Sequence, residues 1–131
     1  MSKSRTKRIL SGTDPFELIP VTLYPYETLE TGNIALHVPK FKNEKFGKLF
    51  LLGKAKPYHI IELDILGTRV YRHINGTNNL FVIFQLVSED GHEPIEQLKE
   101  RGLEFIQQLF NHKYITFKQL QEEAKIQEEK Q

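Results

Sequence analysis

Apolar residues in the first half of the chain follow a pattern that predicts strands. Residues 22–30 and 33–38 are rich in Val, Thr, Tyr, Leu and Ile, and they flank Thr31-Gly32, which is a turn signal. We therefore expect these two stretches to form a hairpin. A third strand is expected at residues 59–63, after a connection that is rich in lysine.

A helical period begins after the third strand. Asp64 stands where a helix N-cap belongs, and apolar residues follow it at four-residue spacing as far as Ile74. Asn75 and Gly76 tolerate the left-handed backbone conformation that ends many helices. The pattern predicts a short helix from Asp64 to about Asn75-Gly76.

The run from Leu80 to Val87 fits either kind of element. Its β-branched and aromatic residues favour a buried strand, whereas the spacing of its apolar residues behind an Asn79 cap fits a helix. We predict a helix over residues 80–90. Such a helix would carry more apolar residues than one buried stripe needs, so some apolar surface would seek a partner such as a second copy; these residues are Phe81, Val82, Phe84 and Leu86.

The longest helix is expected from Pro94 to about His112, where apolar residues recur along one side. Gly102 lies inside it. A glycine there costs about 1 kcal/mol relative to alanine, which indicates that a neighbouring element approaches the backbone closely. Residues 114–117 suit a short strand, and residues 118–131, almost wholly Lys, Gln and Glu, suit a frayed helix or a disordered tail.

The composition predicts one soluble domain. The chain has 131 residues, of which 39% are hydrophobic and 27% charged, enough for a single core. We assign residues 1–15 to a flexible basic arm, residues 16–117 to the domain and residues 118–131 to the tail. No stretch approaches a membrane span or a signal-peptide core, and cysteine is absent, so we expect a cytoplasmic protein without disulfides.

The sequence offers no arrangement of residues that suggests catalysis. Glutamates of the long helix recur at three- and four-residue spacing, as on a solvated face, and no serine stands in a Gly-x-Ser-x-Gly elbow. Each histidine stands without a partner at metal-ligand spacing, so we expect no enzyme activity, no metal and no cofactor. The histidines are His37, His59, His73, His92 and His112.

The distribution of charge argues against recognition of DNA. The net charge is +1, with lysines concentrated in the arm and in residues 40–56. Residues 93–112 carry four glutamates against Lys99 and Arg101, a net charge of −2, so this helix would repel phosphates. Basic segments of this kind are more often simply solvated, and nucleic-acid binding through the arm stays a weaker alternative. If a leader peptide binds, the lysine-rich connection is expected to raise the on-rate for acidic peptides.

One segment carries a resemblance to a known family. Residues 63–76 read Leu-Asp-Ile-Leu-Gly-Thr-Arg-Val-Tyr-Arg-His-Ile-Asn-Gly. This order resembles the signature of the PqqD family, the peptide chaperones of pyrroloquinoline quinone synthesis and the related leader-peptide recognition domains. Tyr71 replaces the usual Trp, and Asn75 replaces the usual Asp. The likeness covers residues 59–117, with further matches at Leu80, Ile83, Val87, Arg101, Phe105, Leu109 and Ile115.

The resemblance implies an α+β fold like a winged helix-turn-helix, with a three-stranded antiparallel sheet followed by a three-helix bundle. It also implies a protein that binds a precursor peptide without chemistry of its own and presents it to a modifying enzyme, in the family often a radical S-adenosylmethionine protein. The peptide of the family adds beside the third strand and lies against the third helix. The corresponding site residues here are His59, Ile60, Ile61 and Glu62 on the strand and Lys99, Leu103, Gln107 and Phe110 on the helix.

Side-chain periodicity refines that expected site. Alternation along the strand should turn Ile61 and Leu63 toward the core and Ile60 and Glu62 away from it. On the long helix, Leu103 and Phe110 are apolar but lie beside the core stripe. These two residues are therefore the candidate apolar lining of the peptide site, the alternative being that they cover the first hairpin or the tail.

Overall fold

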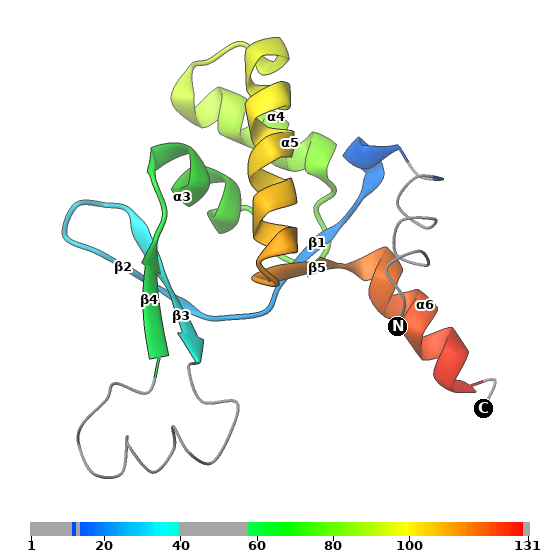
Figure 1. Ribbon diagram of the computed structural model, residues 1–131. Coiled ribbons are helices and arrows are strands. Elements are labelled where there is room, and N and C mark those ends of the chain that lie inside the picture. Colours follow the sequence, from blue (N-terminus) through cyan, green and yellow to red (C-terminus); the bar gives the residue numbers. More distant parts are fainter. Residues whose placement is uncertain (1–11, 13, 40–57, 130–131) are drawn as a thin grey trace, which may run out of the picture. The chain divides into compact units, whose positions relative to one another are not determined.

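The computed structural model describes residue 12, residues 14–39 and residues 58–129 (Figure 1). Nearly all of the basic arm and the whole lysine-rich connection lie outside these described residues. The chain divides into two compact units, the first formed by residues 1–23 with 69–131 and the second by residues 24–68. The elements in chain order are η1 (Pro15–Glu17), β1 (Pro20–Thr22), β2 (Tyr26–Thr28), β3 (Ile34–Pro39), β4 (Tyr58–Glu62), α3 (Ile65–Arg72), α4 (Leu80–Gly91), α5 (Ile95–Asn111), β5 (Ile115–Phe117) and α6 (Lys118–Glu129).

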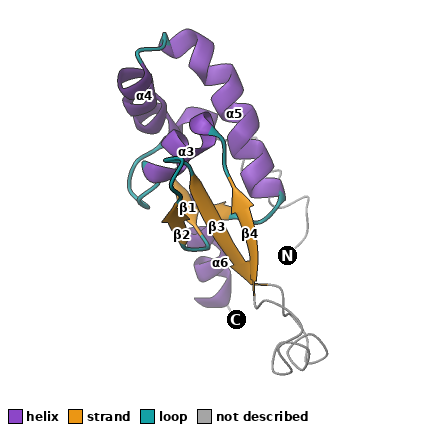
Figure 2. Ribbon diagram, turned by 90° about the vertical axis from the view of Figure 1, so that its left-hand side faces the viewer, coloured by secondary structure: helices purple, strands orange, loops and turns teal. Residues whose placement is uncertain are grey.

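The second unit is built on the expected three-stranded antiparallel sheet. Its strands run in the order β2-β3-β4, with Leu36 of the central strand opposite Tyr26 on one side and Ile61 on the other (Figure 2). The turn between β2 and β3 contains Gly32 at a φ of 93°, a left-handed conformation that glycine adopts without strain. The predicted hairpin and third strand are confirmed.

The first strand of that hairpin is shorter than predicted. The prediction of a single strand over residues 22–30 is wrong. The chain pairs with β5 before Pro25 and with β3 after it. Residues 20–22 form β1, which pairs with β5, and the N–H of Leu23 extends that ladder by donating to the C=O of Tyr114 (3.1 Å). Proline has no N–H to continue a ladder, and β2 starts only after it.

The helix after Asp64 is confirmed but ends earlier than predicted. The Asp64 carboxylate accepts a hydrogen bond from the N–H of Gly67 (2.7 Å), as an N-cap does. Regular helix stops at Arg72, and the N–H of Ile74 donates to the C=O of Tyr71 in a tightened final turn (3.1 Å). Gly76, at a φ of 81°, belongs to the turn that follows and not to the helix end.

The ambiguous run at residues 80–87 is helical, as predicted. The Asn79 side chain accepts a hydrogen bond from the N–H of Val82 (2.9 Å) and caps α4. Four apolar residues of α4 are buried at helical spacing: Leu80, Ile83, Phe84 and Val87. Burial of this stripe outweighs the preference of its residues for strands, because propensity amounts to a fraction of a kcal/mol per residue and burial to about 2 kcal/mol. Phe81 remains 46% exposed.

Helix α5 packs against α4 at Gly102. A Cβ placed on Gly102 would lie 2.7 Å from the ring of Phe84, and that ring is fully buried. The glycine therefore gives the ring the space it occupies, which confirms the predicted close approach. Leu98, Ile106 and Leu109 continue the buried stripe of α5 on the same side.

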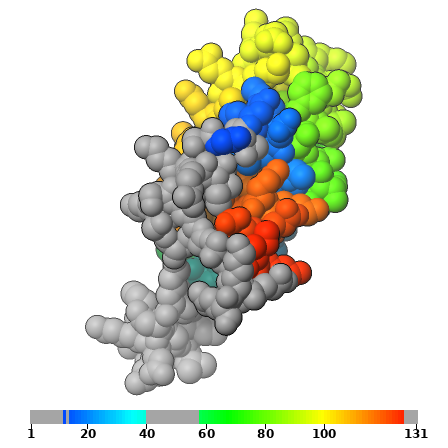
Figure 3. Space-filling view, turned by 90° about the vertical axis from the view of Figure 1, so that its right-hand side faces the viewer, coloured from blue at the N-terminus to red at the C-terminus, as the bar shows by residue number. Residues whose placement is uncertain are grey.

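The first described element, η1, contacts α4 and α6 within the first unit. Phe16 of η1 packs edge-on against Phe84, with 6.1 Å between ring centroids, and Figure 3 shows η1 in blue beside the green of α4. The side-chain amide of Gln119 of α6 binds the end of η1 and the segment after it: it donates to the C=O of Glu17 (3.1 Å) and accepts from the N–H of Ile19 (3.1 Å). Leu120 is buried, so the first turn of the predicted tail is part of the core.

The fold is thus mixed α+β, with a three-stranded antiparallel sheet and four α-helices in the part of the chain that the structure describes. None of the helices within that part combines the length and the apolar content needed to cross a membrane.

Replacing Gly102 by alanine tests the packing of α4 on α5. We expect Gly102→Ala to lower the free energy of unfolding by about 1–3 kcal/mol, because the buried ring of Phe84 cannot move aside without strain. Urea denaturation of the purified chain measures the change. Gly91→Ala is the matched control: its Cβ would meet only the flexible end of Arg69, so stability should stay level or rise by up to about 1 kcal/mol. Equal effects of the two substitutions would contradict the packing argument.

Candidate functional site

Strand β4 forms an edge of the three-stranded sheet within the described residues. The N–H of Leu63 donates to the C=O of Ile34 (2.9 Å), which makes these opposed residues a hydrogen-bonded pair. Bonded and non-bonded pairs alternate along an antiparallel ladder. The main-chain N–H and C=O groups of Glu62, Ile60 and Tyr58 therefore point away from β3, toward the edge.

The other side of the central strand supports this assignment. The N–H of His37 donates to the C=O of Pro25 (3.0 Å), and the N–H of Leu29 donates to the C=O of Asn33 (2.8 Å). Odd-numbered residues of β3 thus bond to β2, which leaves its even-numbered residues to bond to β4. Both ladders give the same set of outward-facing residues on β4.

The side chains of the same three residues share one face of the sheet. Ile60 is 49% exposed and Glu62 is also exposed, whereas Leu63 beyond the strand is buried at 7%. Ile61, on the opposite face, is half-buried, and His59 is exposed. The predicted alternation is confirmed, with Ile60 and Glu62 turned outward.

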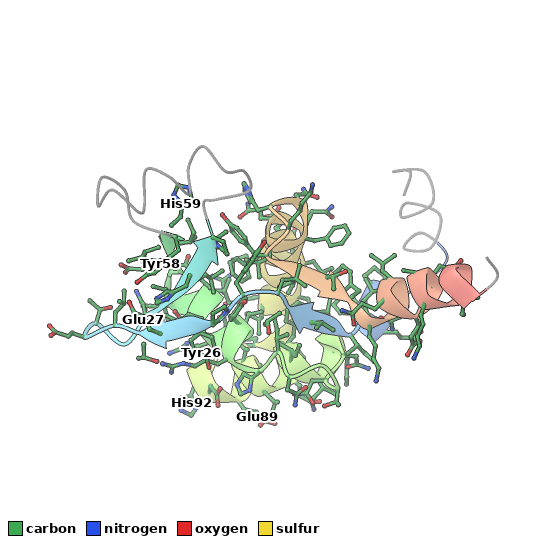
Figure 4. The ribbon with its side chains drawn as sticks, turned by 90° about the horizontal axis from the view of Figure 1, so that it is seen from below. Tyr26, Glu27, Tyr58, His59, Glu89 and His92 are labelled. Carbon is green, nitrogen blue, oxygen red and sulfur yellow. The ribbon has the colours of Figure 1, made fainter. Side chains whose placement is uncertain are left out.

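Two stacked aromatic rings lie on this face at the start of β4. The rings of His37 and Tyr58 are stacked at a centroid distance of 4.7 Å and an interplanar angle of 7°. His37 Nε2 lies 3.5 Å from Glu27 Oε1, so the ring connects the edge strand to β2. Figure 4 shows Tyr58, His59 and Glu27 on these strands.

The far end of β4 is fixed by a buried hydroxyl. Thr68 of α3 is 5% exposed, and its Oγ1 accepts a hydrogen bond from the N–H of Ile34 (3.0 Å) and donates to the C=O of Leu63 (3.4 Å). These are the two main-chain groups that the last pair of the ladder leaves unbonded. Thr68 therefore completes the ladder where the chain leaves the sheet and enters α3.

The predicted residues on α5 lie in the first unit, and two of them contact other elements of that unit. The ammonium group of Lys99 lies 5.3 Å from the ring centroid of Phe16 and 3.5 Å from Glu96 Oε1. Phe110 packs on Phe117 of β5, with 5.1 Å between ring centroids. Intramolecular packing thus already uses these two side chains. Leu103 is half-buried and Gln107 is exposed.

The strand part of the predicted site consequently lies in the second unit, and its helix part lies in the first. The strand part brings together outward main-chain groups and an exposed apolar side chain. It is the candidate functional site on this chain.

Groups that bind metals are scattered. Among the described residues, no three His, Asp or Glu side chains are placed to hold an ion. The closest pairing is His73 Nε2 with Asp90 Oδ2 at 2.7 Å, between the segment after α3 and the end of α4, where both side chains are partly exposed. A single exposed pair of this kind joins two segments and needs no catalytic role.

The sequence reasoning missed two residues that shape the site. Thr68 has no role in the sequence prediction, although its place four residues after the Asp64 cap puts it in the first turn of α3, beside the strand that has just ended. His37 is predicted only as part of the strand at residues 33–38, without a partner at metal-ligand spacing. The register that stacks it on Tyr58 joins segments more than 20 residues apart, and no local pattern reveals that pairing.

Comparison with known proteins gives no match: neither a family model, nor a curated protein, nor a solved structure matches this chain.

Removing the Thr68 hydroxyl should weaken the end of the edge strand. We expect Thr68→Val to lower the free energy of unfolding by about 1–3 kcal/mol, since a buried N–H and a buried C=O both lose their partner. Hydrogen exchange at the Ile34 amide should speed up at the same time. Thr68→Ser keeps the hydroxyl and should protect that amide as the parent does. If the valine variant protected the amide equally well, the hydroxyl would have no part in holding the strand.

Proposed function

We propose that this chain is a non-catalytic peptide-binding protein of the PqqD type, which takes up a precursor peptide as an added strand on β4 and presents it to a modifying enzyme. One observation carries the proposal. The N–H and C=O groups of three successive outward residues, Tyr58, Ile60 and Glu62, face an edge to which no other described strand is paired. Such an edge is a template for an extended peptide.

The order of elements supports the resemblance on which the proposal also draws. A three-stranded antiparallel sheet precedes α3, α4 and α5 along the chain, and the segment that resembles the family signature begins directly after β4 and includes the whole of α3. The winged helix-turn-helix arrangement of these elements belongs to the proposal. So does the second contact of the peptide with α5, which stays a prediction.

Strand addition explains how a protein without catalytic groups can serve a reaction. The main-chain hydrogen bonds of an edge give affinity with little regard to sequence, and side chains beside the edge add preference. A peptide held in this way is extended, so its remaining residues stay accessible to an enzyme. Such a role needs no acid, base or metal from the chain itself.

The surface of α5 favours this function over nucleic-acid binding. Arg101 is ion-paired with Glu93, and Lys99 with Glu96, so both cations of the helix have an acidic neighbour. Helix α5 contains three glutamates against two cations, and Glu93 precedes it, so the helix presents a net negative charge to a phosphate backbone. Duplex DNA would have to bind elsewhere on the chain.

Proline at position 60 tests the edge directly. A display library of random 12-residue peptides, panned on the full chain, supplies the probes. Ile60→Pro removes the outward N–H and leaves the bonds between β3 and β4 in place, because proline is tolerated where an edge N–H faces solvent. We expect it to weaken recovered peptides about tenfold in titrations followed by NMR, since a peptide carbonyl loses its donor.

Two further variants isolate the cause. Ile60→Ala keeps the N–H and should retain most of the affinity, so a loss specific to proline identifies main-chain pairing. Ile61→Pro should disrupt the sheet itself, because that N–H faces β3. Peptides that bind the Ile60→Pro variant as tightly as the parent chain would show that β4 is not their site.

A further inference from the structure

We infer that the peptide taken up at β4 carries lysine or arginine opposite Glu62, two residues away from a β-branched or aromatic residue opposite Ile60. The preference rests on the proposed function, because it concerns the peptide that pairs with this edge. It makes Glu62 a specificity-determining residue and defines a class of peptide by the side chains on one of its faces.

The register across the sheet places the charge. Glu27 of β2 and Glu62 of β4 both lie opposite Ala35 of β3. Opposed residues share a face, so Glu27, Ala35 and Glu62 form one row across the sheet, with strands about 4.8 Å apart. A strand added to β4 contributes the next position of that row. Its side chain would stand directly beside the Glu62 carboxylate.

The described residues of the second unit carry acidic side chains and no basic one except histidine. Residues 24–39 and 58–68 contain four acidic residues and neither lysine nor arginine. Glu62 is exposed, and its carboxylate accepts a long hydrogen bond from the neutral amide of Asn33 (3.5 Å). Glu27 is near the His37 ring on the other side of the row. A cationic side chain beside Glu62 would compensate its charge, whereas an acidic one would be repelled.

The row that contains Ile60 sets the requirement for a β-branched or aromatic residue in the peptide. Ile60 lies opposite His37 and is 49% exposed, so a peptide side chain in this row would cover an apolar surface that water now contacts. Cross-strand pairs of β-branched or aromatic residues are among the favourable ones. Residues on one face of a strand recur every second position, which fixes the two-residue spacing between the basic and the apolar residue in either direction of the peptide.

Selection with matched variants tests this specificity. The same library of random 12-residue peptides is panned on the full chain and counter-selected on Ile60→Pro, so that only peptides pairing with β4 survive. The survivors should be enriched in Lys or Arg two residues from Val, Ile, Thr, Tyr or Phe. Panning on Glu62→Lys should enrich Asp or Glu at that position instead.

A peptide recovered from the library then gives the magnitude of the charge preference. Exchanging its basic residue for glutamate should weaken binding to the parent chain about fivefold at low salt, and strengthen binding to Glu62→Lys by a similar factor. Glu30→Lys is the control, since it makes the same change of charge in the turn between β2 and β3, away from the β4 edge. It should leave the preference of the parent intact.

The possible failures are distinguishable. Peptides that depend on Ile60 but show no charge preference, or an equal inversion of preference by Glu30→Lys, would overturn the role of Glu62 and leave the proposed function standing. Recovery of no peptide sensitive to Ile60→Pro would overturn both. Self-association in sedimentation that Ile60→Pro abolishes would assign the edge to a second copy and overturn the peptide as its occupant.

Discussion

The hydrogen bonds of Thr68 are the constraint on which the candidate site depends. Its buried hydroxyl satisfies the N–H of Ile34 and the C=O of Leu63, the two groups left over where β3 begins and β4 has ended. Because a shift of one residue would leave both groups unpaired in a buried place, this contact opposes slippage of β4 along β3. The register in turn decides which residues of β4 offer their main chain to the edge.

The register determines which main-chain groups and which side chains lie at the edge. The residues whose N–H and C=O groups point outward also share one face, so hydrogen-bonding capacity and side-chain preference come from Tyr58, Ile60 and Glu62 together. The stack of His37 on Tyr58 and the row of Glu27, Ala35 and Glu62 continue this face across the sheet. A slip of one residue would exchange this face for the one that carries His59 and Ile61.

The first unit depends on a different kind of contact. The ring of Phe84 occupies the space that Gly102 leaves open, and Phe16 of η1 packs on the same ring. One aromatic side chain thus joins α4, α5 and the beginning of the described chain. Phe110 and Lys99, which the sequence suggested as binding residues, are engaged in similar packing with Phe117 and Phe16. Apolar residues beside a core stripe are as readily covered by the chain's own segments as by a ligand.

Local chemistry in the sequence determined most of the elements. Asp64 and Asn79 identify two helix starts because a cap acts within three residues, and the spacing of Leu80, Ile83 and Val87 identifies α4 because a buried stripe outweighs propensity. Tertiary structure alone decided the pairing of β1 with β5, the stack of His37 on Tyr58 and the role of Thr68. Each of these joins groups that are distant in sequence, and their meeting depends on strand register and on which buried groups remain to be satisfied, which no window of the sequence contains.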